Sequence, residues 1–199
     1  KKSILIYNPI LDNGYVNVNM KKNQVLFIGS LTEKKGVFDL IRAFKKVSIK
    51  NPDWSLKIAG VGALDNCKEL VKKLDLENVI QFYGWVDGKQ KQKLLQESKV
   101  FCLPSYTEGF PMSLIEAWQN KIVPVVSNVG GIPDVVINNK NGFLIVPGNI
   151  NQLTEKLNIA FNNDDLCSSI LLEGEKFYME SFEIKKLDAL ISDLYFSLV

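Results

Sequence analysis

Six short apolar runs alternate with segments of helical spacing along most of this chain of 199 residues. The apolar runs are residues 24–30, 54–62, 78–86, 99–105, 121–128 and 142–147. The segments between them that carry helical spacing are residues 37–50, 66–75, 89–98, 112–120 and 131–139. Strands that are apolar almost throughout are typical of parallel sheets buried on both faces. The alternation therefore predicts an α/β fold built on a doubly wound parallel sheet.

After Pro147 the pattern changes to helices alone, over residues 149–163, 164–180 and 183–199. We expect one domain over residues 1–199, with a helical C-terminal segment at 150–199. The chain opens at Lys1, without an initiator Met or a signal-peptide pattern. We interpret it as a piece of a longer protein, with residues 1–20 as an inter-domain linker.

Composition excludes several classes of function. The 24 Lys and Arg residues nearly balance the 22 Asp and Glu residues, which argues against a nucleic-acid partner. No apolar stretch approaches the roughly 20 residues of a membrane span. The absence of histidine removes His-based triads, zinc–His sites and a histidine general base. The three cysteines lack C-x-x-C spacing, which indicates a reducing compartment.

Two loops at predicted strand ends could bind a ligand, because ligands of such sheets bind beyond the carboxyl ends of the strands. In the loop 30–36, Lys35 beside Gly36 could reach a phosphate, although this stretch alone favours an ordinary solvated connection. The second loop holds Gly60 and Gly62, but it does not complete a dinucleotide-binding G-x-G-x-x-G motif.

The stretch "PSYTEGFPMSLIEAW", residues 104–118, is richer in candidate ligand groups. Pro111 suits the first turn of a helix, so the N–H groups that follow it would point outward and could bind a phosphate. Glu108 precedes that turn and Glu116 lies about one turn into the helix. Two carboxylates facing one pocket could bind the hydroxyls of a ribose and of a sugar. The alternative is a loop acid and a helix residue on a polar face, and spacing alone favours neither.

The segment "EGFPMSLIE" resembles the E-x7-E signature of retaining glycosyltransferases of the GT-B fold, and especially of their fourth family. Further similar segments follow in the family's order over about residues 24–150: "FIGSLTEKKGVFDLIRAF", "LKIAGVG", "VIQFYGWV", "VPVVSNVGGIPDVV" and "NGFLIVP". The resemblance implies the Rossmann-like C-terminal half of a GT-B enzyme. This half would bind the donor, a nucleoside-diphosphate sugar, and no metal or other cofactor would be needed.

The same resemblance implies a role for individual residues. Glu116 would bind the ribose hydroxyls, Glu108 would contact the transferred sugar and Lys35 would pair with the diphosphate. Glu108 and Lys35 are the expected catalytic groups, with Glu108 acting by position and charge rather than as a proven nucleophile. The expected donor-binding residues are Gly29, Ser30, Lys35, Val86, Glu108, Gly109, Phe110, Pro111, Met112, Ser113 and Glu116.

Two departures from the family pattern qualify these expectations. Ser30 stands where the family commonly has an arginine. Three alternatives stay open: Lys34 compensates for the lost charge, another contact replaces it, or the donor binds weakly. The acceptor-binding N-terminal domain is absent, so we expect the isolated chain to bind donor and to transfer poorly. The expected setting is bacterial polysaccharide or glycoconjugate synthesis in the cytoplasm, at the inner face of the membrane if the missing domain contacts it. A non-catalytic nucleotide-sugar binding module and a GT-B sugar-nucleotide epimerase remain the alternatives.

Overall fold

The computed structural model describes residues 20–182, which form a parallel six-stranded sheet in the order β3-β2-β1-β4-β5-β6. The strands are β1 (Lys22–Ile28), β2 (Ser55–Ala59), β3 (Ile80–Gly84), β4 (Ser98–Leu103), β5 (Val123–Ser127) and β6 (Phe143–Ile145). The central strands are buried along nearly their whole length because helices cover both faces. The predicted α/β fold is confirmed.

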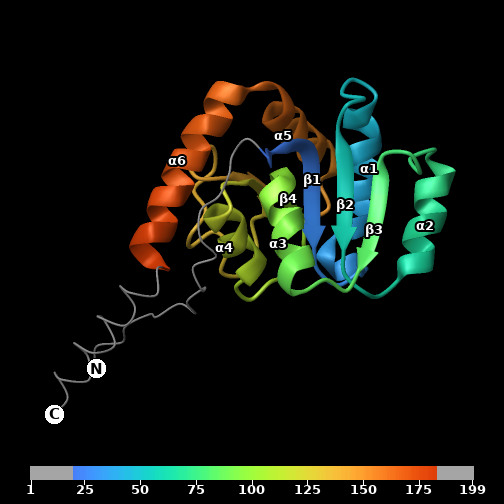
Figure 1. Cartoon of the computed structure of the whole chain (residues 1–199), viewed down its shortest axis with the longest axis horizontal. Helices are drawn as coiled ribbons and strands as arrows, with labels where there is room; N and C mark the ends of the chain where they lie inside the picture. Colours follow the sequence, from blue (N-terminus) through green and yellow to red (C-terminus); the bar gives the residue numbers. More distant parts are fainter. Residues whose placement is uncertain (1–19, 183–199) are drawn as a thin grey trace, which may run out of the picture.

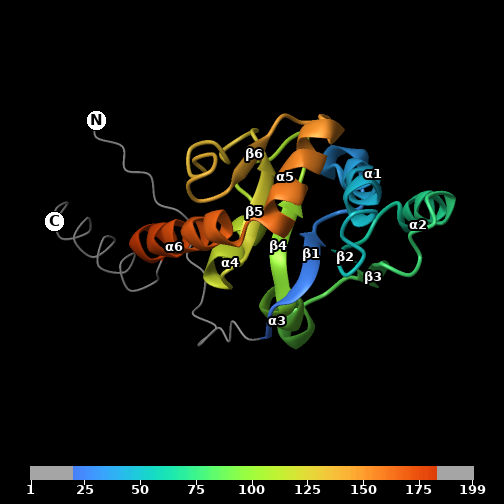
Figure 2. The same ribbon diagram turned by 90° about the horizontal axis from the view of Figure 1, so that it is seen from above.

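The helices flank this sheet in two layers. They are α1 (Val37–Ser48), α2 (Leu64–Lys73), α3 (Gly88–Glu97), α4 (Met112–Gln119), α5 (Ile150–Asn162) and α6 (Asp164–Ser181), with a short 3-10 helix, η2, at Glu33–Lys35. Figure 1 shows α2 and α6 at opposite ends of the sheet. Figure 2 shows α1 and α5 on one side of it, with α3 and α4 on the other.

The C-terminal helices α5 and α6 lie where the sequence predicts helices, whereas the segment 183–199 is outside the described residues. Residues 1–19 of the expected linker also lie outside the described residues. Helix α6 packs against α4, α5 and β5. Helix α5 packs against α1, and its Phe161 stacks on Trp54 with ring centroids 3.6 Å apart.

The helix predicted over residues 131–139 is wrong, because these residues form a series of turns between β5 and β6. Asn141 takes over local backbone groups. Its side chain accepts from the N–H of Ile137 at 2.7 Å and donates to the carbonyl of Val135 at 2.9 Å. The side chain of a buried asparagine thus satisfies groups that a helix would have paired.

The strand order fixes where a ligand can bind. The chain winds outward from β1 to β3 and then crosses to β4, so the direction of winding reverses between β1 and β4. At such a switch point the loops after the two strands diverge and leave a crevice at the carboxyl edge. The loops after β1 and β4 are the two that carry Lys35 and Glu108.

Candidate functional site

Lys35 and Glu108 meet at this switch point. Lys35 ends the short helix η2 after β1, and its Nζ lies 2.7 Å from Oε1 of Glu108, in the loop after β4. The same Oε1 accepts a hydrogen bond from Oγ of Ser105 at 2.6 Å. The Glu108 side chain is 6% exposed and that of Lys35 is 29% exposed. The Glu108 side chain is therefore shielded from solvent, whereas the Lys35 side chain is partly accessible.

Backbone contacts hold the two loops together. The N–H of Tyr106 donates to the carbonyl of Lys34 at 2.8 Å. Gly36 has φ +69°, and a Cβ there would lie 2.0 Å from the carbonyl oxygen of Pro104. Only glycine allows so close an approach in that conformation. The predicted importance of the Lys35–Gly36 pair thus has a structural reason, which is that Gly36 lets the loop carrying Lys35 lie against the loop carrying Glu108.

Glu116 is paired with a second lysine. Its Oε1 lies 2.6 Å from Nζ of Lys91, which projects from α3. The Glu116 side chain is 18% exposed, and its other oxygen, Oε2, is buried with no hydrogen-bond partner among residues 20–182. Buried carboxylate oxygens are normally hydrogen-bonded, so the unpaired Oε2 marks Glu116 as a candidate acceptor for a donor group of a ligand.

The turn between the two carboxylates begins α4 as expected. Pro111 is the residue before the first helical position, Met112. The N–H of Leu114 donates to the carbonyl of Pro111 at 3.1 Å, which leaves the N–H groups of Met112 and Ser113 for a ligand. Gly109 is exposed, and a Cβ at this position would meet nothing within 4 Å. The backbone at Gly109 therefore faces open space next to the positive end of α4.

Gly130 and Gly131, in the loop after β5, contact the backbone of this turn. The N–H of Gly131 donates to the carbonyl of Gly109 at 2.8 Å. A Cβ on Gly130, which has φ +55°, would lie 1.9 Å from the carbonyl oxygen of Glu108. The backbone that carries Glu108 is thus fixed by direct contact with a neighbouring loop.

The remaining residues predicted to bind the donor differ in exposure and in contacts. Gly29 directly follows β1 and its N–H donates to the carbonyl of Ala59 at 3.0 Å. Ser30 is exposed, and Met112 and Ser113 are half-buried at the start of α4. Phe110 stacks on Phe182 with centroids 5.9 Å apart, so its ring packs on the end of α6. Val86 is buried beyond the end of β3, next to Trp85, which is 73% exposed.

Sequence reasoning missed Ser105, Lys91 and the glycine pair 130–131. Ser105 stands three residues before Glu108, where a hydroxyl can reach back to a carboxylate, and that spacing was a usable signal. Lys91 gave no such signal, because one lysine among several on a polar helix does not reveal its partner. The glycine pair is visible in the sequence, but its contact with Glu108 depends on tertiary packing.

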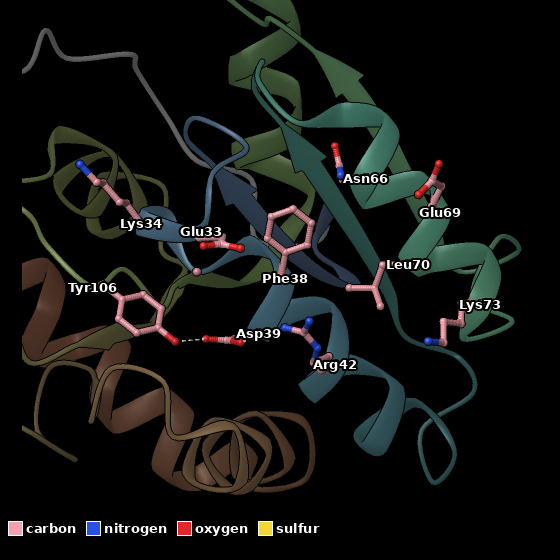
Figure 3. Close-up of a pocket in the computed structure, with 11 residues that line it drawn as sticks. Glu33, Lys34, Phe38, Asp39, Arg42, Asn66, Glu69, Leu70, Lys73 and Tyr106 are labelled. Atoms are coloured by element: carbon pink, nitrogen blue, oxygen red, sulfur yellow. Dashed lines mark hydrogen bonds and ion pairs between the residues drawn. The ribbon is translucent and has the colours of Figure 1, made fainter.

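A separate groove of about 790 Å³ lies between α1 and α2. Figure 3 shows Phe38 and Leu70 between the two helices, with Asn66, Glu69 and Lys73 along α2 and Arg42 on α1. At its margin, Oη of Tyr106 donates to Oδ2 of Asp39 at 2.7 Å, and this bond raises the pKa of Tyr106. Neither glutamate of the E-x7-E segment lines this groove.

Comparison with known protein families identifies the kind of domain that carries the switch-point site. The family model described as glycosyl transferases group 1 matches residues 14–176 and so covers β1 to α6. The chain is a member of this family. The match contains Lys35, Lys91, Glu108 and Glu116 within a group 1 glycosyl transferase domain.

Curated relatives of the chain are also named as glycosyltransferases. An uncharacterized glycosyltransferase of Haemophilus influenzae is 31% identical over 170 residues, covering 84% of this chain and 47% of the relative. A glycosyltransferase of Salmonella typhimurium, WcaL, named for colanic acid biosynthesis, is 27% identical over 180 residues, covering 86% of this chain and 44% of the relative. The chain thus spans about half the length of the curated relatives it matches.

Solved structures show the same fold. The C-terminal domain of LpcC, a group 1 glycosyl transferase from Francisella tularensis, has a TM-score of 0.75 at 25% identity, with 81% of this chain and 86% of that domain covered. Anabaena HepE, solved with UDP and glucose, has a TM-score of 0.80 at 20% identity, covering 89% of this chain and 49% of HepE. The GT-B type of the domain, predicted from sequence, is confirmed.

Two further properties concern residues 20–182 of this group 1 domain. None of their helices is both long and apolar enough to cross a bilayer. Their Cys, Asp and Glu side chains form no group of three that could hold a metal ion. The expectation that the reaction needs no metal stays a prediction.

Proposed function

We propose that this chain is the donor-binding domain of a retaining glycosyltransferase, which transfers a sugar from a nucleoside-diphosphate sugar to an acceptor. The observation that carries the proposal is the pairing of each glutamate of the E-x7-E segment with a lysine at the switch point. This places two carboxylates, two cations and the N-terminus of α4 at one carboxyl edge. A nucleoside-diphosphate sugar offers hydroxyls for the carboxylates and phosphates for Lys35 and the start of α4.

Each group then has a chemical task. Lys35 has three N–H donors and uses one on Glu108, so the others can reach a diphosphate. The N–H groups at the start of α4 would bind the same diphosphate. Glu116 would accept from the ribose hydroxyls through Oε2, and Glu108, held by Ser105 and Lys35, would face the transferred sugar.

These tasks fit transfer with retention. The bond between the anomeric carbon and the phosphate oxygen breaks, a bond from the acceptor oxygen to that carbon forms on the same face, and the departing phosphate takes the acceptor proton. Negative charge grows on the phosphate in an oxocarbenium-like transition state. Lys35 and the α4 N-terminus stabilise that charge, which lowers the barrier without a covalent intermediate on Glu108.

The name of WcaL and the UDP bound in HepE support a setting in bacterial polysaccharide or glycoconjugate synthesis and a nucleotide-sugar donor. In this proposal the acceptor is bound by a second, N-terminal domain, since the chain spans less than half of the H. influenzae relative. Any membrane contact would then come from that domain, at the cytoplasmic face.

Calorimetric titration with UDP, GDP and ADP and their glucose conjugates tests the division of roles. Glu116→Ala should weaken binding of the free nucleotide, by about tenfold or more for a lost charged hydrogen bond. Glu108→Gln should leave free-nucleotide binding almost unchanged and weaken the sugar conjugate. Equal losses of free nucleotide in both variants would contradict the assignment. Turnover by the full-length protein separates transfer from a non-catalytic binding module, which would bind the donor and neither transfer nor hydrolyse its sugar.

A further inference from the structure

Among residues 20–182, Lys91 is the one side chain from outside the loops after β1 and β4 that bonds the carboxylate of either glutamate. It lies in the first turn of α3, and Glu116 lies in the second turn of α4. The two helices begin at the same carboxyl edge of the sheet. A contact of 2.6 Å between their side chains therefore joins two helices at the mouth of the site.

The far ends of α3 and α4 are fixed to each other as well. Nζ of Lys21 donates to the carbonyls of Leu95, Ser98 and Asn120 at 3.1, 2.9 and 2.7 Å. Nε2 of Gln92 also donates to Oδ1 of Asn120 at 2.9 Å. Because these bonds fix the relative position of the two helices, Lys91 is presented to Glu116 by a rigid frame.

The contact divides the Glu116 carboxylate into two unequal oxygens. Oε1 is occupied by the ammonium group of Lys91, whereas Oε2 is buried and has no hydrogen-bond partner among residues 20–182. A carboxylate held by one oxygen cannot rotate freely, so its second oxygen points in a defined direction. The lysine also offsets a negative charge that would otherwise repel a nucleoside diphosphate.

We propose that Lys91 is a positioning and specificity residue of the nucleotide site: it orients the Glu116 carboxylate so that Oε2 accepts a ribose hydroxyl, and thereby selects ribonucleotides over their deoxy analogues. The inference rests on the proposed function, because it needs a nucleotide at Glu116. It adds a residue from α3 to a site that otherwise centres on the loops after β1 and β4 and on the first turns of α4. Lys91 touches no reacting atom in this role and acts through Glu116.

The test is a double-mutant cycle on nucleotide binding. Wild type, Lys91→Met, Glu116→Ala and the double variant are titrated with UDP, GDP and ADP, each beside its 2′- and 3′-deoxy analogues. Lys91→Met should weaken the ribonucleotide by about tenfold and the deoxy analogue much less, so the preference for ribose shrinks. The double variant should bind no more weakly than Glu116→Ala alone, because Lys91 acts only through that carboxylate.

Two further variants separate positioning from general damage. Lys93→Met is the matched control, since Lys93 lies two residues along α3 on a different helical face and is exposed. It should bind like wild type. Lys91→Arg should restore most of the ribose preference, because a guanidinium can also hold Oε1. A Lys91→Met variant that merely distorts the fold would weaken ribo- and deoxynucleotides equally and would resist rescue by arginine.

The outcomes are distinct. Additive losses in the double variant, with the ribose preference intact in Lys91→Met, would show an independent phosphate contact and overturn the proposal. So would ribonucleotide binding by Lys91→Met at wild-type strength. If the wild-type chain binds none of the three diphosphates, the proposed function fails instead, and the inference fails with it.

Discussion

Nζ of Lys35 and Oε1 of Glu108 lie 2.7 Å apart although the two residues are 73 positions apart in the chain. The contact exists because the winding of the sheet reverses between β1 and β4, which brings the loops after these strands together. It places a cation directly beside the carboxylate expected to face the transferred sugar.

Lys35→Met should weaken binding of UDP, GDP or ADP by about tenfold or more, since a charge-assisted contact to phosphate is lost. Lys34→Met is the matched control, because Lys34 is exposed and its side chain extends away from α1 and α2 in Figure 3. Its variant should bind within about twofold of wild type, a difference of only ~0.4 kcal/mol. Calorimetric titration measures both. A loss in Lys34→Met as large as in Lys35→Met would instead identify Lys34 as the cation that replaces the family arginine at Ser30.

Gly130→Ala should destabilise the protein and displace Glu108. The added Cβ would lie 1.9 Å from the carbonyl oxygen of Glu108, and the left-handed backbone at φ +55° is itself costly for alanine. We expect a loss of about 2–4 kcal/mol in the free energy of unfolding, larger than the conformational cost alone. Urea unfolding measures it.

Gly84→Ala is the control for that experiment. Gly84 has φ +64°, but a Cβ there would meet nothing within 4 Å. Its variant should therefore show only the conformational cost, about 1 kcal/mol. Losses of similar size at the two glycines would mean that the collision with Glu108 is relieved by a small shift, against the prediction.

Lys21 should make stability depend on pH. Burial lowers its pKa in the folded protein to about 7, from 10.5 in the unfolded chain. Between these values the unfolded chain binds the proton more tightly, so this contribution to stability is full above pH 10.5 and falls as the pH falls toward 7. The free energy of unfolding of wild type minus that of Lys21→Met should thus rise with pH by at most about 1.4 kcal/mol per pH unit. Urea unfolding of both proteins at pH 7, 8 and 9 measures this difference, and a difference that does not change with pH would contradict the prediction.

Trp85 should report on a nucleotide bound at Val86, its neighbour in the chain. It is 73% exposed, whereas Trp54 and Trp118 are 4% and 2% exposed. Acrylamide should therefore quench mainly the emission of Trp85, and Trp85→Phe should remove most of the quenchable signal. Val86 is one of the expected donor-binding residues, so a bound nucleotide should reduce quenching of the neighbouring Trp85 in wild type. Equal quenching of wild type and Trp85→Phe would contradict the exposure of this side chain.

The sequence was sufficient to predict the fold class and the two loops of the site, for identifiable reasons. Apolar runs such as residues 99–105 are typical of strands in a sheet that is covered on both faces. Pro111 indicates the start of a helix because proline is favoured there. The helix predicted over residues 131–139 failed because the periodic pattern did not reveal that the side chain of Asn141 would pair the local backbone.

Pairings across the chain could not be predicted in this way. Glu116 looks like an ordinary helix residue until α3 brings Lys91 to it, and the distance of 2.6 Å depends on how the two helices pack. Ser105 and Gly130 likewise gain their roles from contacts with Glu108. Local sequence determines which residues reach the carboxyl edge, whereas tertiary packing determines their partners.

Chemical-shift mapping of the backbone amides tests the central claim most directly, because it locates the nucleotide among the described residues. UDP, GDP and ADP are titrated into the isotope-labelled chain. The account predicts that the nucleotide which binds shifts the amides of Lys35, Gly109, Ser113 and Glu116 most, with Lys91 beside them. Largest shifts at Asn66, Glu69 and Lys73, in the groove between α1 and α2, would contradict it.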